Sequence, residues 1–149
     1  MGWFTSTKTP TSADNFSPQE AFLAIALATS AADGQIVEEE ARGIFAYLLQ
    51  MKMFDSYSER GMSDMFKKLI TVLQNEGVAG LVAIAKSSLP AELRETAFSC
   101  AVDIALADGV VEEGEKAMLE ELQQVLEVSD ELGAKILEVM LIKNRNQSV

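Results

Sequence analysis

Two short stretches of the chain carry the same carboxylates at the same spacing. Each reads Asp-Gly-x-(Ile or Val)-x-Glu-x-Glu, and the two begin at Asp33 and at Asp108. Carboxylate oxygens are the ligands that hard cations such as calcium and magnesium take in proteins. The aspartate and the last glutamate of each stretch could therefore hold such a cation weakly, as a pair. The candidate metal ligands are Asp33, Glu40, Asp108 and Glu115.

The motif matches only the second half of an EF-hand calcium loop. Its aspartate, glycine, branched residue and last glutamate stand at the fifth, sixth, eighth and twelfth loop positions. The first and third positions need oxygen ligands, but they hold Thr29 and Ala31 in one copy and Ile104 and Leu106 in the other. A complete EF-hand is therefore excluded.

The same motif also suits a simple turn between two helices. Its glycine permits the left-handed backbone that ends a helix, and its aspartate can accept backbone hydrogen bonds in the turn. The last glutamate falls in the first turn of the next helix, where the helix dipole favours negative charge. In this alternative the acidic residues are only helix caps and bind no ligand.

Composition limits the chemistry that these carboxylates could join. The chain has 149 residues, no histidine and one cysteine, Cys100. Without histidine, the Ser-His and Cys-His nucleophile pairs and an ordinary zinc site are ruled out. We therefore expect that the protein is not an enzyme.

Charge and cysteine content indicate the compartment and the partners. The net charge of −11 argues against nucleic acid and anionic membrane surfaces as partners, and it favours cations or basic partners. One cysteine allows no disulfide within the chain, which fits a cytoplasmic location. The longest apolar run, residues 21–32, is about half of a membrane span, and the N-terminus lacks a signal-peptide pattern.

The elements that would position the motifs are all helices, because no window alternates with the period of two that a sheet needs. Ser17 and Glu20 form a capping-box pattern before an alanine-rich helix that runs to about residue 32. Further helices are predicted from about residue 38, from 56 to 75, from 78, from 90 to 108, across 119–126 and from 129. The predicted class is all-α, with about seven helices.

An internal repeat organises these helices. When the chain is shifted by 75 residues, residues 31–40 lie over residues 106–115 with five of ten positions identical. In both copies an apolar helix precedes the Asp-Gly turn and an amphipathic helix follows it. We therefore expect a single pseudo-twofold bundle made of two helix–Asp-Gly–helix repeats.

The chain divides into a lead-in segment and one domain. Residues 1–16 are rich in Thr and Ser and are predicted to be flexible, whereas residues 17–149 form the all-helical domain. Trp3 and Phe4 interrupt the polar lead-in, and they either dock on the domain or stay loose.

Three further features have a structural interpretation. Asp103 lines up with other polar residues along its predicted helix, which places it on a solvated face. Cys100 lies on the opposite, apolar side and is expected to be a buried core residue. Met62 and Met65 are expected to pack in the core.

The two alanine-rich helices, each ending in Ala-Asp-Gly with a glutamate seven residues after the aspartate, resemble the tellurite-resistance TerB-like family over roughly residues 18–142. The resemblance implies an all-helical domain of two related halves in a bacterial cytosol. It also implies association with metal-stress or membrane-linked defence complexes. It implies a metal-binding role for the acidic loop residues Asp33, Glu40, Asp108 and Glu115.

The resulting expectation is a non-enzymatic stress-response domain that binds or senses a divalent cation, calcium or magnesium, through its acidic Asp-Gly loops. The alternative is a protein-interaction module with no ligand. In both cases we expect protein partners, which include membrane-linked complexes, and no nucleic acid or direct membrane insertion.

Overall fold

The computed structural model describes residues 16–31, 38–107 and 113–145, and within these ranges it contains helices and no strand. The elements follow in the order α1 (Pro18–Ser30), α2 (Glu38–Leu49), the short 3-10 helix η1 (Lys52–Phe54), α3 (Glu59–Ser88), α4 (Ala91–Ala105), α5 (Glu113–Val125) and α6 (Asp130–Lys143). The predicted all-α class is confirmed.

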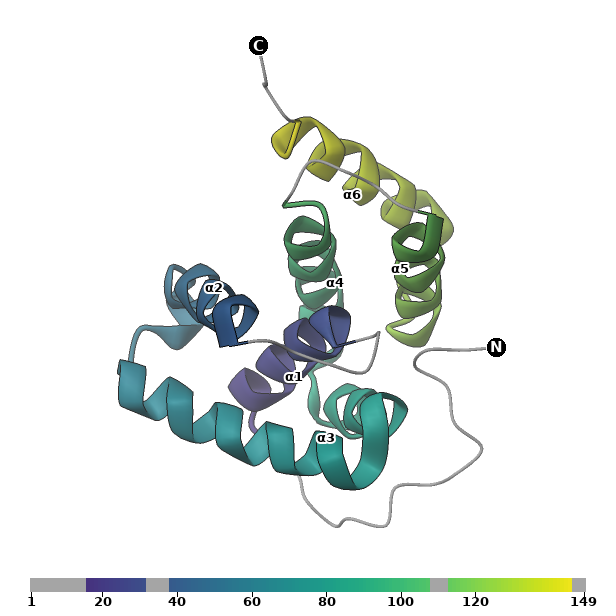
Figure 1. Ribbon diagram of the computed structural model, residues 1–149. Helices are drawn as coiled ribbons and strands as arrows, with labels where there is room; N and C mark the ends of the chain where they lie inside the picture. The colour runs from purple at the N-terminus through teal and green to yellow at the C-terminus, as the bar shows by residue number, and fades with distance from the viewer. Residues whose placement is uncertain (1–15, 32–37, 108–112, 146–149) are drawn as a thin grey trace.

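Helix α1 lies in the middle of the molecule, with α3 packed on one side and α4 on another (Figure 1). The predicted capping box is present: Ser17 Oγ accepts from the Glu20 N–H at 3.0 Å, and Glu20 Oε1 accepts from the Ser17 N–H at 2.9 Å. Every residue from Ala21 to Thr29 is buried. An all-round apolar helix of this kind needs neighbours on every side, and α1 therefore forms the centre of the core.

Helix α3 joins two segments that the sequence predicts as separate helices. It runs from Glu59 to Ser88, but its regular geometry is interrupted at Gly77, where φ is 77° and ψ is 174°. A residue with a side chain rarely adopts this φ, whereas glycine adopts it readily. The predicted break at residues 75–77 is therefore real. Because the second segment follows without a loop, the described part of the chain has six α-helices instead of about seven.

By length and composition alone, α3 is also the one described helix that could cross a membrane. Its residues Met65, Leu69 and Val72 are buried in the core, and the helix packs extensively on α1. The kink at Gly77 divides it further. These are the properties of a core helix.

The repeat is visible in the order of the helices. Helix α1 ends at Ser30 and α2 begins at Glu38, and the ends of α4 and α5 that correspond to them, Ala105 and Glu113, are each offset by 75 residues. In each half the second helix packs on the first, and the third returns to the first: α3 packs on α1, and α6 on α4. Helices α1 and α4 meet between the halves (Figure 1). The molecule is the predicted bundle of two related halves.

Candidate functional site

The described structure contains only half of the predicted metal ligands. Glu40 is the third residue of α2 and is exposed, and Glu115 is the third residue of α5 and is half-buried. Asp33 and Asp108 lie outside the described residues. Within the described ranges, no group of three Asp, Glu, Cys or His side chains is arranged to hold a metal ion.

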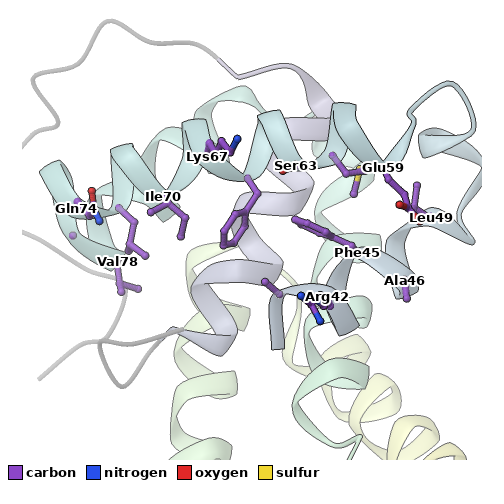
Figure 2. A pocket seen from close by; sticks show the side chains of 15 residues that line it. Arg42, Phe45, Ala46, Leu49, Glu59, Ser63, Lys67, Ile70, Gln74 and Val78 are labelled. Carbon is purple, nitrogen blue, oxygen red and sulfur yellow. The ribbon is translucent and has the colours of Figure 1, made fainter. Parts of the chain in front are cut away.

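A groove between α2 and the first segment of α3 is the largest feature that sequence analysis missed. It has a volume of about 1280 Å³. Its walls are helix faces, and in Figure 2 Phe45 and Leu49 come from α2 while Ile70 and Val78 come from α3. The complete lining is Ala41, Arg42, Phe45, Ala46, Leu49, Glu59, Met62, Ser63, Phe66, Lys67, Ile70, Leu73, Gln74, Gly77 and Val78.

Two aromatic rings meet where the walls of the groove come together. Phe45 of α2 and Phe66 of α3 pack edge to face, with ring centroids 5.4 Å apart and an angle of 83° between the ring planes. Both side chains remain half-buried. Such a pair stabilises the approach of two helices and leaves apolar ring surface for a further contact.

The charged groups of the groove stand along its edges. Arg42 on α2 is exposed, as are Glu59 and Lys67 on α3. Met62, by contrast, is fully buried beneath them. The groove therefore has an apolar interior and a polar rim, the usual anatomy of a recognition surface.

The groove exists because both helices have more apolar residues than one core-facing stripe requires. In α2, Ile44 and Leu48 face the core, while Phe45 and Leu49 form a second stripe beside them. In α3 the second stripe is Phe66, Ile70 and Leu73, at helical spacing. Sequence analysis assigned such residues to a single core face; the width of the apolar face was the signal that could have revealed the groove.

A second polar cluster joins three helices around Asp103, and here the sequence prediction was wrong. Asp103 of α4 is only 4% exposed and does not lie on a solvated face. Its Oδ2 accepts from the Tyr47 hydroxyl at 2.6 Å, and its Oδ1 accepts from Lys143 Nζ at 3.1 Å and Asn144 Nδ2 at 2.7 Å. The polar stripe on α4 is covered at this end by α2 and by the end of α6, which the periodicity of α4 alone could not show.

The ionisation of this cluster follows from its contacts. Burial raises the pKa of Asp103, but the hydrogen bonds from Tyr47, Asn144 and Lys143 and the charge of Lys143 outweigh burial and leave the pKa lowered. Burial and the bond to Asp103 raise the pKa of Tyr47 far above its ordinary value. Asp103 is therefore a carboxylate and Tyr47 a neutral donor, which suits a structural tie between helices.

Cys100 is buried beside this cluster, as the sequence predicts. Its Sγ lies 3.9 Å from the sulfur of Met51. Burial raises the pKa of the Cys100 thiol more than a hydrogen bond with Tyr47 lowers it, and the charge of Asp103 raises it further. A thiol that keeps its proton is a poor nucleophile, so Cys100 is a core residue. Met62 and Met65 are buried as well, as predicted.

Comparison with known proteins identifies the family. Residues 19–136 match the family model described as Tellurite resistance protein TerB. That range begins at the start of α1 and ends within α6, so it includes both repeats and both walls of the groove. Neither a curated protein nor a solved structure matches the chain. Because the match covers most of the sequence, and the all-helical fold of two halves agrees with it, the chain belongs to the TerB family of tellurite resistance proteins.

Proposed function

We propose that this chain is a non-catalytic, cytoplasmic stress-response domain of the TerB family that binds a protein partner in the α2–α3 groove. The observation that carries the proposal is the groove itself, with about 1280 Å³ of space, an apolar interior and charges confined to its rim. Apolar surface of this extent on a folded domain marks a site of interaction. The lining offers hydrophobic contact, which favours recognition over bond making.

The partner segment that fits best is an amphipathic helix. On α3 the lining residues Phe66, Ile70 and Leu73 recur every three or four positions, so both walls present the ridges of a helix surface. A third helix can lay its own ridges between them and complete a three-helix cluster. The described residues offer no strand edge with which an extended peptide could pair.

A rival apolar surface lies on α6, where Val139, Leu141 and Ile142 are exposed. These side chains stand on one convex helix and are not part of the groove lining. A convex helix surface lacks walls to enclose a ligand, and high-affinity contacts concentrate in pockets that exclude water. The groove is therefore the stronger candidate, and the α6 surface provides matched control positions.

Site-specific photo-cross-linking in cells tests the proposal. A photoreactive residue would replace Lys67 at the groove rim and, in a control, Lys116, an exposed lysine on α5. We expect a discrete cross-linked protein from position 67 only, and mass spectrometry should place the link in a segment with apolar residues every three or four positions. Equal cross-linking from both positions would contradict the proposal.

A second function, cation binding by the Asp-Gly motifs, is supported by the equivalent positions of Glu40 and Glu115. Each is the third residue of the second helix in its half, and the two helices begin 75 residues apart. Two carboxylates per motif, Asp33 with Glu40 and Asp108 with Glu115, would hold calcium or magnesium weakly.

Thermal unfolding with added ions tests this second candidate. A ligand that binds only the folded state adds about 2.7 kcal/mol to stability at one hundred times its Kd. Glutamine at positions 40 and 115 keeps the side-chain shape but removes the charge. We expect calcium or magnesium to raise the melting temperature of the wild type but not of Glu40→Gln combined with Glu115→Gln. Identical melting of all proteins with and without ions would exclude the metal function.

A further inference from the structure

We propose that the groove between α2 and α3 is occupied, in the absence of a partner, by the chain's own N-terminal segment through Trp3 and Phe4. This inference rests on the proposed function of the groove and adds a regulatory occupant to it. A partner helix would then have to displace the segment before it could bind.

The first step of the argument is where the segment joins the domain. Phe16 is buried, and its backbone N–H donates to Ser88 Oγ at 3.1 Å. Lys68 Nζ lies 5.6 Å from the centroid of the Phe16 ring and also pairs with Glu20 at 3.0 Å. Lys67, the neighbour of Lys68 on α3, lines the groove. The segment therefore starts from a fixed point on the helix that forms one wall.

The second step is the length of chain between that point and the aromatic pair. Eleven residues separate Phe4 from Phe16. An extended chain of this length reaches about 36–40 Å. The α3 wall runs from Glu59 to Gly77, which at 1.5 Å per residue is about 27 Å. Trp3 and Phe4 can thus reach every part of the groove.

The third step is chemical fit. Trp3 and Phe4 are adjacent aromatic residues, followed by a run of mostly polar residues. The groove presents the edge-to-face pair of Phe45 and Phe66 within an otherwise aliphatic lining. Aromatic side chains gain more from burial than any others, and they stack favourably against further rings. No other residues of the segment before Phe16 have this character.

Attachment makes even a weak contact effective. A short linker presents its end at an effective concentration on the order of 1 mM. A segment with a Kd of about 0.1 mM would then fill the groove about nine-tenths of the time and weaken the binding of a competitor about tenfold.

Trp3 is the only tryptophan of the chain, so its fluorescence reports directly on the segment. Acrylamide quenching would be measured for the full chain and for a free peptide of residues 1–15. We expect Trp3 to be quenched several-fold less in the full chain. Ile70→Asp and, at an exposed rim position, Ala46→Arg should restore quenching to that of the peptide, whereas Val139→Asp on α6 should not. Circular dichroism would verify that each variant is folded.

A competition measurement provides the second readout. The probe is a labelled synthetic amphipathic helix of leucine, alanine and glutamine, and its binding is followed by fluorescence anisotropy. Trp3→Ala combined with Phe4→Ala should raise its affinity about tenfold, as expected for the loss of an attached competitor. These substitutions lie outside the described domain and leave the groove itself unchanged.

Three outcomes would overturn the inference. Trp3 quenching equal to that of the free peptide would show that the segment is undocked, and protection unaffected by Ile70→Asp and Ala46→Arg would place it elsewhere. Protection that grows with protein concentration, with a dimeric mass, would assign the groove to the segment of a second copy. In each case probe binding that Ile70→Asp abolishes would still support the groove as a partner site. Failure of the probe to bind the Trp3→Ala, Phe4→Ala protein would count against the proposed function itself.

Discussion

The two halves of the molecule use the same order of helices but treat the space between the second and third helix differently. In the second half α5 and α6 close on each other: Gly133 of α6 is buried, and a Cβ atom there would lie 2.5 Å from Cδ of Gln123 on α5. Gln123 also bonds to the Val128 carbonyl at 3.3 Å and to Asp130 at 2.9 Å. In the first half α2 and α3 leave the groove between them (Figure 2).

The difference shows how a duplicated unit can acquire one binding surface. A glycine permits the close approach of α6 to α5. The first half places the bulky pair Phe45 and Phe66 between α2 and α3, and these rings touch at their edges and hold the helices apart. The second half thus provides a closed support, and the first half an open groove. The Asp103 cluster links them, because it joins α2 of the first half to α4 and α6 of the second.

The largest expected effect comes from removing the link between the halves. Asp103→Ala leaves the Tyr47 hydroxyl and the Asn144 amide without their acceptor, and we expect a loss of about 2–3 kcal/mol of unfolding free energy. Lys143 is largely exposed and adds little to this figure. Urea unfolding would measure the change, with Asp64→Ala on the exposed side of α3 as a control. A loss no greater than that of the control would mean that the halves are held together by apolar packing alone.

The next effect concerns the closed space between α5 and α6. Gly133→Val would place a branched side chain against Gln123 and break the bonds of Gln123 to Val128 and Asp130. Overpacking of this kind costs about 1–3 kcal/mol, which thermal unfolding would detect. If the variant melts as the wild type does, α6 can move away from α5 freely, and the contrast between the halves would disappear.

A glycine of the first half should respond in the opposite direction. Gly43 is an exposed residue inside α2, and a Cβ atom there meets nothing within 4 Å. Gly43→Ala should therefore stabilise the protein by about 0.5–1 kcal/mol, because alanine loses less backbone entropy in a helix. Differential scanning calorimetry would show a higher melting temperature. A decrease would indicate that α2 is packed more tightly than an open groove allows.

The smallest effect is a pH dependence of the link. Because the folded-state pKa of Asp103 is lowered, its contribution to stability is present above the unfolded-state pKa of about 3.9 and is lost as pH falls through the folded-state value. The difference in unfolding free energy between the wild type and Asp103→Ala should be constant near neutral pH and shrink below about pH 4. Urea titrations at neutral and acidic pH would measure it. A constant difference over the whole range would show that the carboxylate charge is not what binds the helices.

Local patterns in the sequence were sufficient for the fold. The capping box at Ser17 and Glu20, the break at Gly77 and the 75-residue repeat all depend on residues close together in the chain or on direct self-comparison, and each is present. The groove and the burial of Asp103 depend instead on how helices far apart in sequence meet. Periodicity tells which residues share a face, but it does not tell whether another helix covers that face completely. The metal ligands stay a prediction, because Asp33 and Asp108 lie outside the described residues.

The central claim is that the open space of the first half, and not the closed second half, receives a partner helix. Methyl resonances measured while the synthetic leucine, alanine and glutamine helix is added would test it most directly. The account predicts shifts at Ile70, Leu73 and Val78, which line the groove, with Leu132, Ile136 and Val139 of α6 unchanged. Shifts confined to the α6 methyl groups, with the groove resonances unmoved, would contradict the account.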